Sequence, residues 1–113
     1  MKELEIGNKK LEEYFAKLGF SVLHFPGSKQ ANGPDMWVRK LDGRPLSVEI
    51  KIARKKSNEC WLVDSVTPGR RKDDLIAIIL NKEYVLIEPM KDHLRACSRT
   101  GDRPLTLLMG KNP

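Results

Sequence analysis

The residues at positions 47–52 alternate between polar and apolar side chains, and this alternation constrains the fold more than any other stretch of the chain. Successive side chains of a β-strand point to opposite faces, so Val48, Ile50 and Ile52 share one apolar face. Glu49 and Lys51 share the other face. We predict a strand that packs its apolar face against a core and presents a charged pair on its other face.

A second acidic residue, Asp35, stands at the start of the preceding strand, which we expect over Met36–Lys40. The pair Asp42-Gly43 marks a turn into the strand Leu46–Ala53, so the two strands form a hairpin. Directly opposed residues of an antiparallel pair point to the same face. Asp35 therefore shares a face with Glu49 only if the loop holds an odd number of residues.

A loop of three residues that starts at Asp42 meets this condition and sets Asp35 opposite Lys51. A two-residue turn would set Asp35 opposite Ile50, on the wrong face. Pro45 lacks an N–H and discourages tight pairing at the turn. We therefore predict the longer loop, or a bulge.

Two carboxylates and an ammonium that converge in this way suit metal-assisted phosphodiester hydrolysis. Carboxylate oxygens suit a hard Mg²⁺ ion, which activates a water and neutralises charge on the phosphate. Lys51 can orient that water or stabilise the developing negative charge. The simpler alternative is a solvated strand face at Glu49 and Lys51, with Asp35 serving ordinary turn chemistry.

The rest of the chain predicts a small α/β fold without internal repeats, organised as a single domain over residues 1–113. The apolar run Leu75–Leu80 is typical of a strand buried on both faces, and Gly19 is expected to end the first helix. The further expected elements are a helix over 2–18, strands over 20–25, 59–64, 84–87 and 105–108, a loop over 26–33, a turn at 81–82, and a helix over 89–97. The strand over 59–64 is expected to extend the hairpin into a three-stranded meander.

The formal net charge of +6 and the pI of about 9.5 favour a polyanionic partner such as DNA. Two basic clusters, Arg54-Lys55-Lys56 and Arg70-Arg71-Lys72, are expected in loops that flank the acidic residues, and Lys29 lies in the loop before Asp35. They are candidate phosphate contacts, although solubilising loop charges are the commoner case. The apolar runs are too short for a membrane span and the N-terminus has no signal segment, so an intracellular, cytoplasmic protein is expected.

These motifs resemble the PD-(D/E)XK nucleases, and within them the archaeal Holliday junction resolvases. The likeness covers roughly residues 4–63 and consists of a helix ending in Leu18-Gly19-Phe20, the loop Gly27-Ser28-Lys29, Pro34-Asp35 and Glu49-Ile50-Lys51. It implies a restriction-endonuclease-like core with a mixed central β-sheet flanked by helices. It also implies Mg²⁺-dependent (or Mn²⁺-dependent) DNA cleavage, often by a homodimer.

Carried over by position, the resemblance makes Asp35, Glu49 and the Ile50 backbone carbonyl the metal ligands. Lys51 becomes the catalytic lysine, and Ser28 lies near the scissile phosphate. The family usually has a glutamate on the first helix, at a position that Asn8 occupies here. Glu5 and Glu12 each lie about one helical turn away, and we favour Glu5 as the substitute.

Residues beyond 64 do not match the resolvases well, so branched DNA as substrate does not carry over securely. We expect a metal-dependent DNA endonuclease of the compact kind that suits phages and mobile elements. The alternative from another class is a catalytically inactive DNA-binding protein that retains the nuclease fold, which Asn8 favours and the set Asp35, Glu49 and Lys51 opposes. A third interpretation is a basic interaction protein in which the motif is accidental.

Overall fold

The computed structural model describes residues 2–23, 35–57, 60–80 and 84–106. Two helices and eight strands are built from them, with one short 3₁₀ helix, η1. In chain order these elements are α1 (Lys2–Lys17), β1 (Phe20–Leu23), β2 (Met36–Lys40), β3 (Leu46–Ile52), β4 (Arg54–Ser57), β5 (Cys60–Val63), η1 (Pro68–Arg70), β6 (Leu75–Leu80), β7 (Tyr84–Pro89), α2 (Met90–Ala96) and β8 (Arg103–Thr106).

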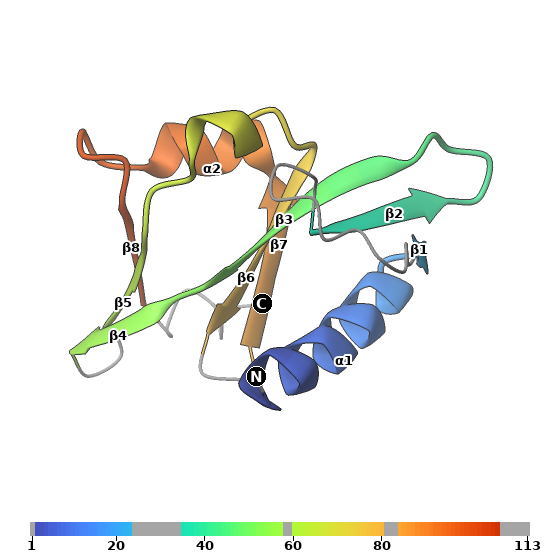
Figure 1. The fold of residues 1–113 in the computed structure, drawn as a ribbon, viewed down its shortest axis with the longest axis horizontal. Helices are drawn as coiled ribbons and strands as arrows, with labels where there is room; N and C mark the ends of the chain where they lie inside the picture. Colours follow the sequence, from blue (N-terminus) through green and yellow to red (C-terminus); the bar gives the residue numbers. More distant parts are fainter. Residues whose placement is uncertain (1, 24–34, 58–59, 81–83, 107–113) are drawn as a thin grey trace.

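The strands form two sheets that share one continuous stretch of chain (Figure 1). The larger sheet has the order β1-β2-β3-β6-β7, and only the β3–β6 pair is parallel. The smaller sheet has the order β4-β5-β8 and is antiparallel. Because β3 runs almost directly into β4, one segment of chain belongs to both sheets.

The larger sheet separates two apolar clusters. On one face, Leu11 and Phe15 of α1 pack against Val38, Val48 and Ile79. On the opposite face, β6 residues pack against the smaller sheet and α2, in a cluster that includes Trp61, Val63, Ile76, Ile78, Met90 and Leu105. Figure 1 shows α1 and α2 on opposite sides of the sheet. Glu49 and Lys51 belong to the face that α1 does not cover, because their neighbours Val48 and Ile50 face α1.

The sequence predicts most elements correctly. Helix α1 spans residues 2–17, and Gly19 follows it with φ +89°, a conformation that glycine adopts without steric cost. Strand β6 lies between β3 and β7 and is almost wholly buried, as its apolar run indicates. The expected strand end at 24–25, the loop over 26–33, the turn at 81–82 and the strand end at 107–108 lie outside the described residues.

Three expectations are wrong. The strand β5 does not extend the hairpin into a meander, because β6 occupies that edge of β3 and β5 pairs with β4 instead. Arg54-Lys55-Lys56 lies on strand β4 rather than in a loop. The ladder between β2 and β3 ends where Val38 pairs with Leu46. The pairing of the two strands is therefore shifted by two residues from the predicted register. A backbone turn from Lys40 to Gly43, with Asp42 at φ +63°, takes up the difference.

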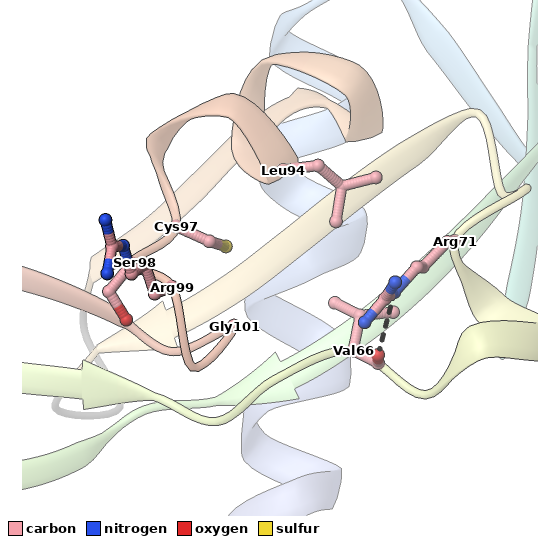
Figure 2. Close-up of a pocket in the computed structure, with 7 residues that line it drawn as sticks. All are labelled: Val66, Arg71, Leu94, Cys97, Ser98, Arg99 and Gly101. Carbon is pink, nitrogen blue, oxygen red and sulfur yellow. Dashed lines mark hydrogen bonds between the residues drawn. The ribbon is translucent and has the colours of Figure 1, made fainter.

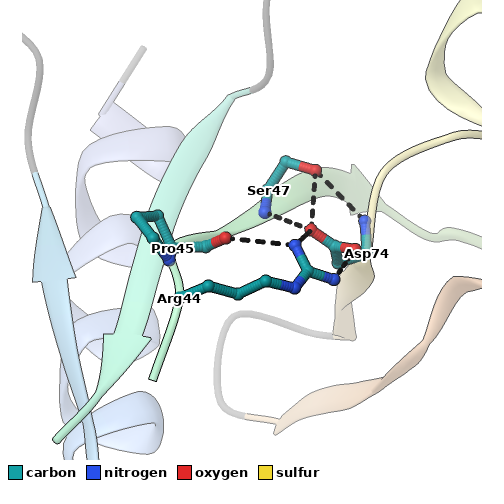
Figure 3. A network of polar contacts seen from close by, with 4 residues as sticks. All are labelled: Arg44, Pro45, Ser47 and Asp74. Carbon is teal, nitrogen blue, oxygen red and sulfur yellow. Dashed lines mark hydrogen bonds and ion pairs between the residues drawn. The ribbon is translucent and has the colours of Figure 1, made fainter. Parts of the chain in front are cut away.

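Asp74 ties the beginning of β3 to the beginning of β6 (Figure 3). Its carboxylate accepts hydrogen bonds from the Ser47 amide at 3.0 Å and from the Arg44 guanidinium at 2.9 Å. Its own amide donates to Ser47 Oγ at 3.1 Å. The Arg44 guanidinium holds the pKa of Asp74 below its ordinary value. Non-local polar contacts thus fix the parallel strand pair at its N-terminal end.

A buried polar group joins the two sheets on the other side of the molecule. Arg103 on β8 donates to Glu88 on β7 and lies 3.1 Å from Nδ1 of His93 on α2. His93 is fully buried, and this burial lowers its pKa. One guanidinium therefore connects an edge of each sheet with α2.

The packing of α1 predicts a stability difference between two apolar truncations. Phe15→Ala should lower the free energy of unfolding by about 3–5 kcal/mol, because the ring is fully buried between α1 and the sheet. Leu41→Ala is the control, since Leu41 is 91% exposed and should change stability by less than about 0.5 kcal/mol. Urea denaturation measures both, and equally small losses would contradict the packing of α1.

Candidate active site

Asp35 lies directly beside Glu49, at the point where β2 begins. The ladder pairs Met36 with Val48, and the chain bends at Asp35. The Asp35 amide donates to the Val48 carbonyl at 3.1 Å, and Asp35 Oδ2 accepts from the Ile50 amide at 2.8 Å. Asp35 is thus bonded to the residues on both sides of Glu49, whereas the sequence prediction set it opposite Lys51.

The Ile50 carbonyl faces the same edge of β3 as Asp35. In a β-ladder, the N–H and C=O of one residue point to the same neighbouring strand. The Ile50 N–H points to Asp35, so the Ile50 C=O also lies on this side, past the beginning of β2. The backbone oxygen that the family resemblance assigns to a metal therefore lies on the edge that carries Asp35.

Glu49 is buried, with 7% of its surface exposed, whereas Asp35 is exposed. Burial, the hydrogen bond to Asp35 and the negative charge of Asp35 together raise the pKa of Glu49 to about 8. The positive charge of Lys51 acts in the opposite direction. Two carboxylates are thus held together at the rim of the core, one inside and one at the surface.

The Lys51 ammonium donates to the backbone carbonyl of Ser65 at 3.3 Å. Ser65 lies in the connection between β5 and η1, so a residue far along the chain fixes the end of this side chain. Lys51 lowers the pKa of Glu49 while its ammonium bonds Ser65, so its charge lies near both the carboxylates and that connection.

Asp73 is a third acidic residue near the pair that sequence reasoning missed. Its side chain is buried, Oδ2 has no hydrogen-bond partner among the described residues, and Oδ1 lies 3.5 Å from the Arg70 guanidinium. Burial raises the pKa of Asp73, and Asp73 in turn contributes to the raised pKa of Glu49. The sequence feature that could have identified Asp73 is the pair Asp73-Asp74, directly before the apolar strand. This pair indicates a residue near Glu49 only once β6 is known to pair with β3.

The first helix covers the other face of the sheet, so Glu12 does not lie on the face that carries Glu49. Glu5 and Asn8 lie within α1, but their side chains are outside the described residues. Within the described part of the chain, no group of three or more His, Cys, Asp or Glu residues is arranged to hold a metal. The choice of Glu5 as a further ligand stays a prediction.

The predicted DNA-binding residues have different surroundings. Ser28 and Lys29 lie outside the described residues. On β4, Arg54, Lys55 and Lys56 are exposed, and Arg54 pairs with Asp64 at 3.0 Å. In the second cluster, Arg70 pairs with Asp73, Arg71 donates to the Val66 carbonyl at 3.4 Å, and Lys72 is exposed.

The arrangement of strands and helices is similar to that of a solved nuclease structure. Among solved structures, the chain is similar to the bacterial homing endonuclease I-Ssp6803I, with a TM-score of 0.68 and 18% sequence identity. The match covers 90% of this chain and 71% of that one. The predicted α/β fold, with a mixed central sheet flanked by helices, is therefore confirmed. No protein-family model and no curated protein matches the sequence.

None of the helices in the described residues is long and apolar enough to cross a membrane.

The raised pKa of Glu49 predicts an unusual pH dependence of stability. The folded protein holds this proton up to about pH 8, against an ordinary pKa of 4.5. The stability that the protonated group contributes is therefore fully present below the ordinary pKa and is lost as the pH rises toward 8. In Glu49→Gln the group does not titrate, so the stability of the metal-free wild-type protein should fall relative to this variant between about pH 5 and about pH 8.

Urea denaturation in a chelator, at several pH values, measures this difference. The opposite pKa shift of Asp74 removes stability only as the pH falls, and it is common to both proteins. Parallel stability curves for the two proteins would contradict the shift at Glu49.

Proposed function

We propose that the chain is a Mg²⁺-dependent or Mn²⁺-dependent DNA endonuclease that hydrolyses phosphodiester bonds. The observation that carries the proposal is the contact of exposed Asp35 with buried Glu49 in a fold similar to that of a homing endonuclease. Membership of the PD-(D/E)XK superfamily is part of the proposal.

The residues present fit a divalent cation. The mutual repulsion of Asp35 and Glu49 and the unpartnered oxygen of buried Asp73 are what a cation would relieve. Mg²⁺ is usually bound by one or two carboxylates, with waters and substrate phosphates completing the shell. Asp35, Glu49 and the Ile50 carbonyl would hold it, and the bound metal supplies an activated water and neutralises charge on the phosphate.

The remaining groups act on the DNA. Lys51 places a positive charge beside the carboxylates, where it stabilises the charge that develops on the phosphate. The exposed cations of β4 contact phosphates further along the backbone, because β4 continues the strand that carries Glu49 and Lys51. Lys72 and the paired arginines before it form a second group of phosphate contacts near Asp73.

The similar structure is a bacterial homing endonuclease, which agrees with the expectation of a compact enzyme from a mobile element or phage. Branched DNA and a homodimeric assembly are further parts of the proposal, taken from the resemblance to the resolvases. Plasmid, single-stranded and four-way-junction DNA, each tested with Mg²⁺ and Mn²⁺, distinguish these substrates.

Removal of one carboxylate should separate cleavage from binding. We expect Asp35→Ala and Glu49→Ala to abolish cleavage and to keep or raise DNA affinity in the absence of metal, because carboxylates repel phosphates. Lys51→Ala should lower the cleavage rate by about 10²-fold with a smaller effect on metal binding. Gel assays of cleavage and fluorescence anisotropy of DNA binding measure the two properties.

Glu13→Ala is the matched control, because Glu13 is an exposed residue of α1. This variant should cleave DNA like the wild-type protein. Undiminished cleavage by Glu49→Ala would show that the activity comes from elsewhere. A wild-type chain that binds DNA but cuts none of the substrates would instead support the inactive DNA-binding protein.

The salt dependence of DNA binding should show whether the cations of β4 contact phosphates. Log affinity falls with log salt by roughly 0.9 for each phosphate contacted on duplex DNA. Lys55→Ala combined with Lys56→Ala should therefore flatten this slope by up to about 2 and weaken binding to all sequences about equally. The charge-matched control combines Lys10→Ala with Lys17→Ala on α1, on the other side of the sheet.

An unchanged slope in the β4 variant would show that these lysines are solvated charges. Loss of binding to only one sequence or one DNA shape would show that β4 reads the substrate rather than its backbone.

A further inference from the structure

The Lys51 ammonium donates its hydrogen bond to a backbone carbonyl rather than to a neighbouring carboxylate. Its bond to the Ser65 carbonyl, at 3.3 Å, crosses from the larger sheet to the connection that follows β5. An ammonium has three donors, so one bond to a fixed carbonyl leaves donors for a water and a phosphate oxygen. The position of Lys51 then depends on what holds Ser65.

Asp102 holds Ser65 from the other side. The Ser65 amide donates to Asp102 Oδ1 at 2.9 Å, so Ser65 is bonded to Lys51 through its carbonyl and to Asp102 through its amide. Asp102 is fixed in turn by the turn after α2, because the Ser98 amide donates to the Asp102 carbonyl at 2.7 Å and the Gly101 amide donates to the Ser98 carbonyl at 2.9 Å. The bonds form a chain from this turn to the ammonium.

The turn after α2 packs tightly against Ser65 at Gly101. Gly101 has φ +91°, and a Cβ built there would lie 2.8 Å from Ser65 Cβ. Any other residue at this position would push Ser65 or the turn away from their present contact. The close approach of these two backbones therefore requires glycine.

A pocket lies beside Val66, the residue that follows Ser65. The pocket has a volume of about 240 Å³ and lies between Val66 and Arg71 on one side and Leu94 and Cys97 on the other (Figure 2). Arg71 donates to the Val66 carbonyl at 3.4 Å across its rim. Val66 is itself buried in the apolar cluster, so packing holds the segment after Ser65, while hydrogen bonds hold the Ser65 backbone.

We propose that Asp102 is a positioning residue for Lys51, acting through the backbone of Ser65. The proposal rests on the proposed function for its catalytic consequence, but the chain of contacts exists independently of it. Asp102 touches neither the carboxylate pair nor the ammonium, so it affects the reaction only by setting where Lys51 lies.

The test compares Asp102→Ala with Asp102→Asn, whose amide oxygen still accepts the Ser65 N–H. We expect Asp102→Ala to lower kcat by about 10- to 100-fold, the range expected when a catalytic group is slightly misplaced. KM for DNA should stay the same, and Asp102→Asn should restore most of the rate. Asp102→Glu gives the same comparison with the charge kept and the carboxylate one methylene further out.

Asp92→Ala is the control for loss of an acidic residue, because Asp92 is exposed in the first turn of α2. All rates are measured well below the thermal midpoint of each variant, so that a purely structural role lowers the midpoint without changing kcat. An unchanged kcat in Asp102→Ala, or an equal loss in Asp102→Asn and Asp102→Ala, would overturn the proposal.

A second readout does not depend on cleavage. The ¹⁵N–¹H correlation of the Lys51 ammonium, assigned by its absence in Lys51→Arg, should show slower hydrogen exchange in the wild type and in Asp102→Asn than in Asp102→Ala. If the wild-type chain cuts no DNA, the proposed function fails, and the exchange rates still decide whether Asp102 positions Lys51. Equal exchange in all three proteins would overturn the positioning role.

Discussion

The parallel pairing of β3 with β6 is the constraint on which the rest of the structure depends. It places an almost wholly apolar strand beside the strand that carries Glu49 and Lys51. Each face of that strand pair then packs against a different layer, α1 on one side and the smaller sheet with α2 on the other. Charged residues can remain in such a strand only near its rim, and Asp35 meets Glu49 there.

Local patterns in the sequence predict a large part of this arrangement. The alternation around Glu49 gives the faces of β3, and the odd loop length correctly brings Asp35 to the side of Glu49. The apolar run before Leu80 gives the buried strand, and the three-to-four spacing that includes Leu11 and Phe15 gives α1. Each of these features depends on residues that are close together in the chain, and the periodicity of a strand or helix reports it directly.

The parts that were missed depend on contacts between distant residues. The sequence does not show that β6, rather than β5, lies next to β3, so it could not place Asp73 near Glu49. The bond of Lys51 to Ser65 is invisible for the same reason, since a backbone carbonyl has no side-chain pattern. The exact pairing in the hairpin depends on the left-handed conformation of Asp42, which residue types alone do not specify.

The guanidinium of Arg103 has a consequence for how the molecule can deform. Separating the two sheets would break the partly buried ion pair of Arg103 with Glu88 and the contact of Arg103 with His93. These contacts, together with the apolar cluster between the sheets, oppose a change in the angle between the sheets when a partner binds. For a duplex DNA partner, the adjustment of shape falls on the nucleic acid, whose base steps differ in how easily they bend.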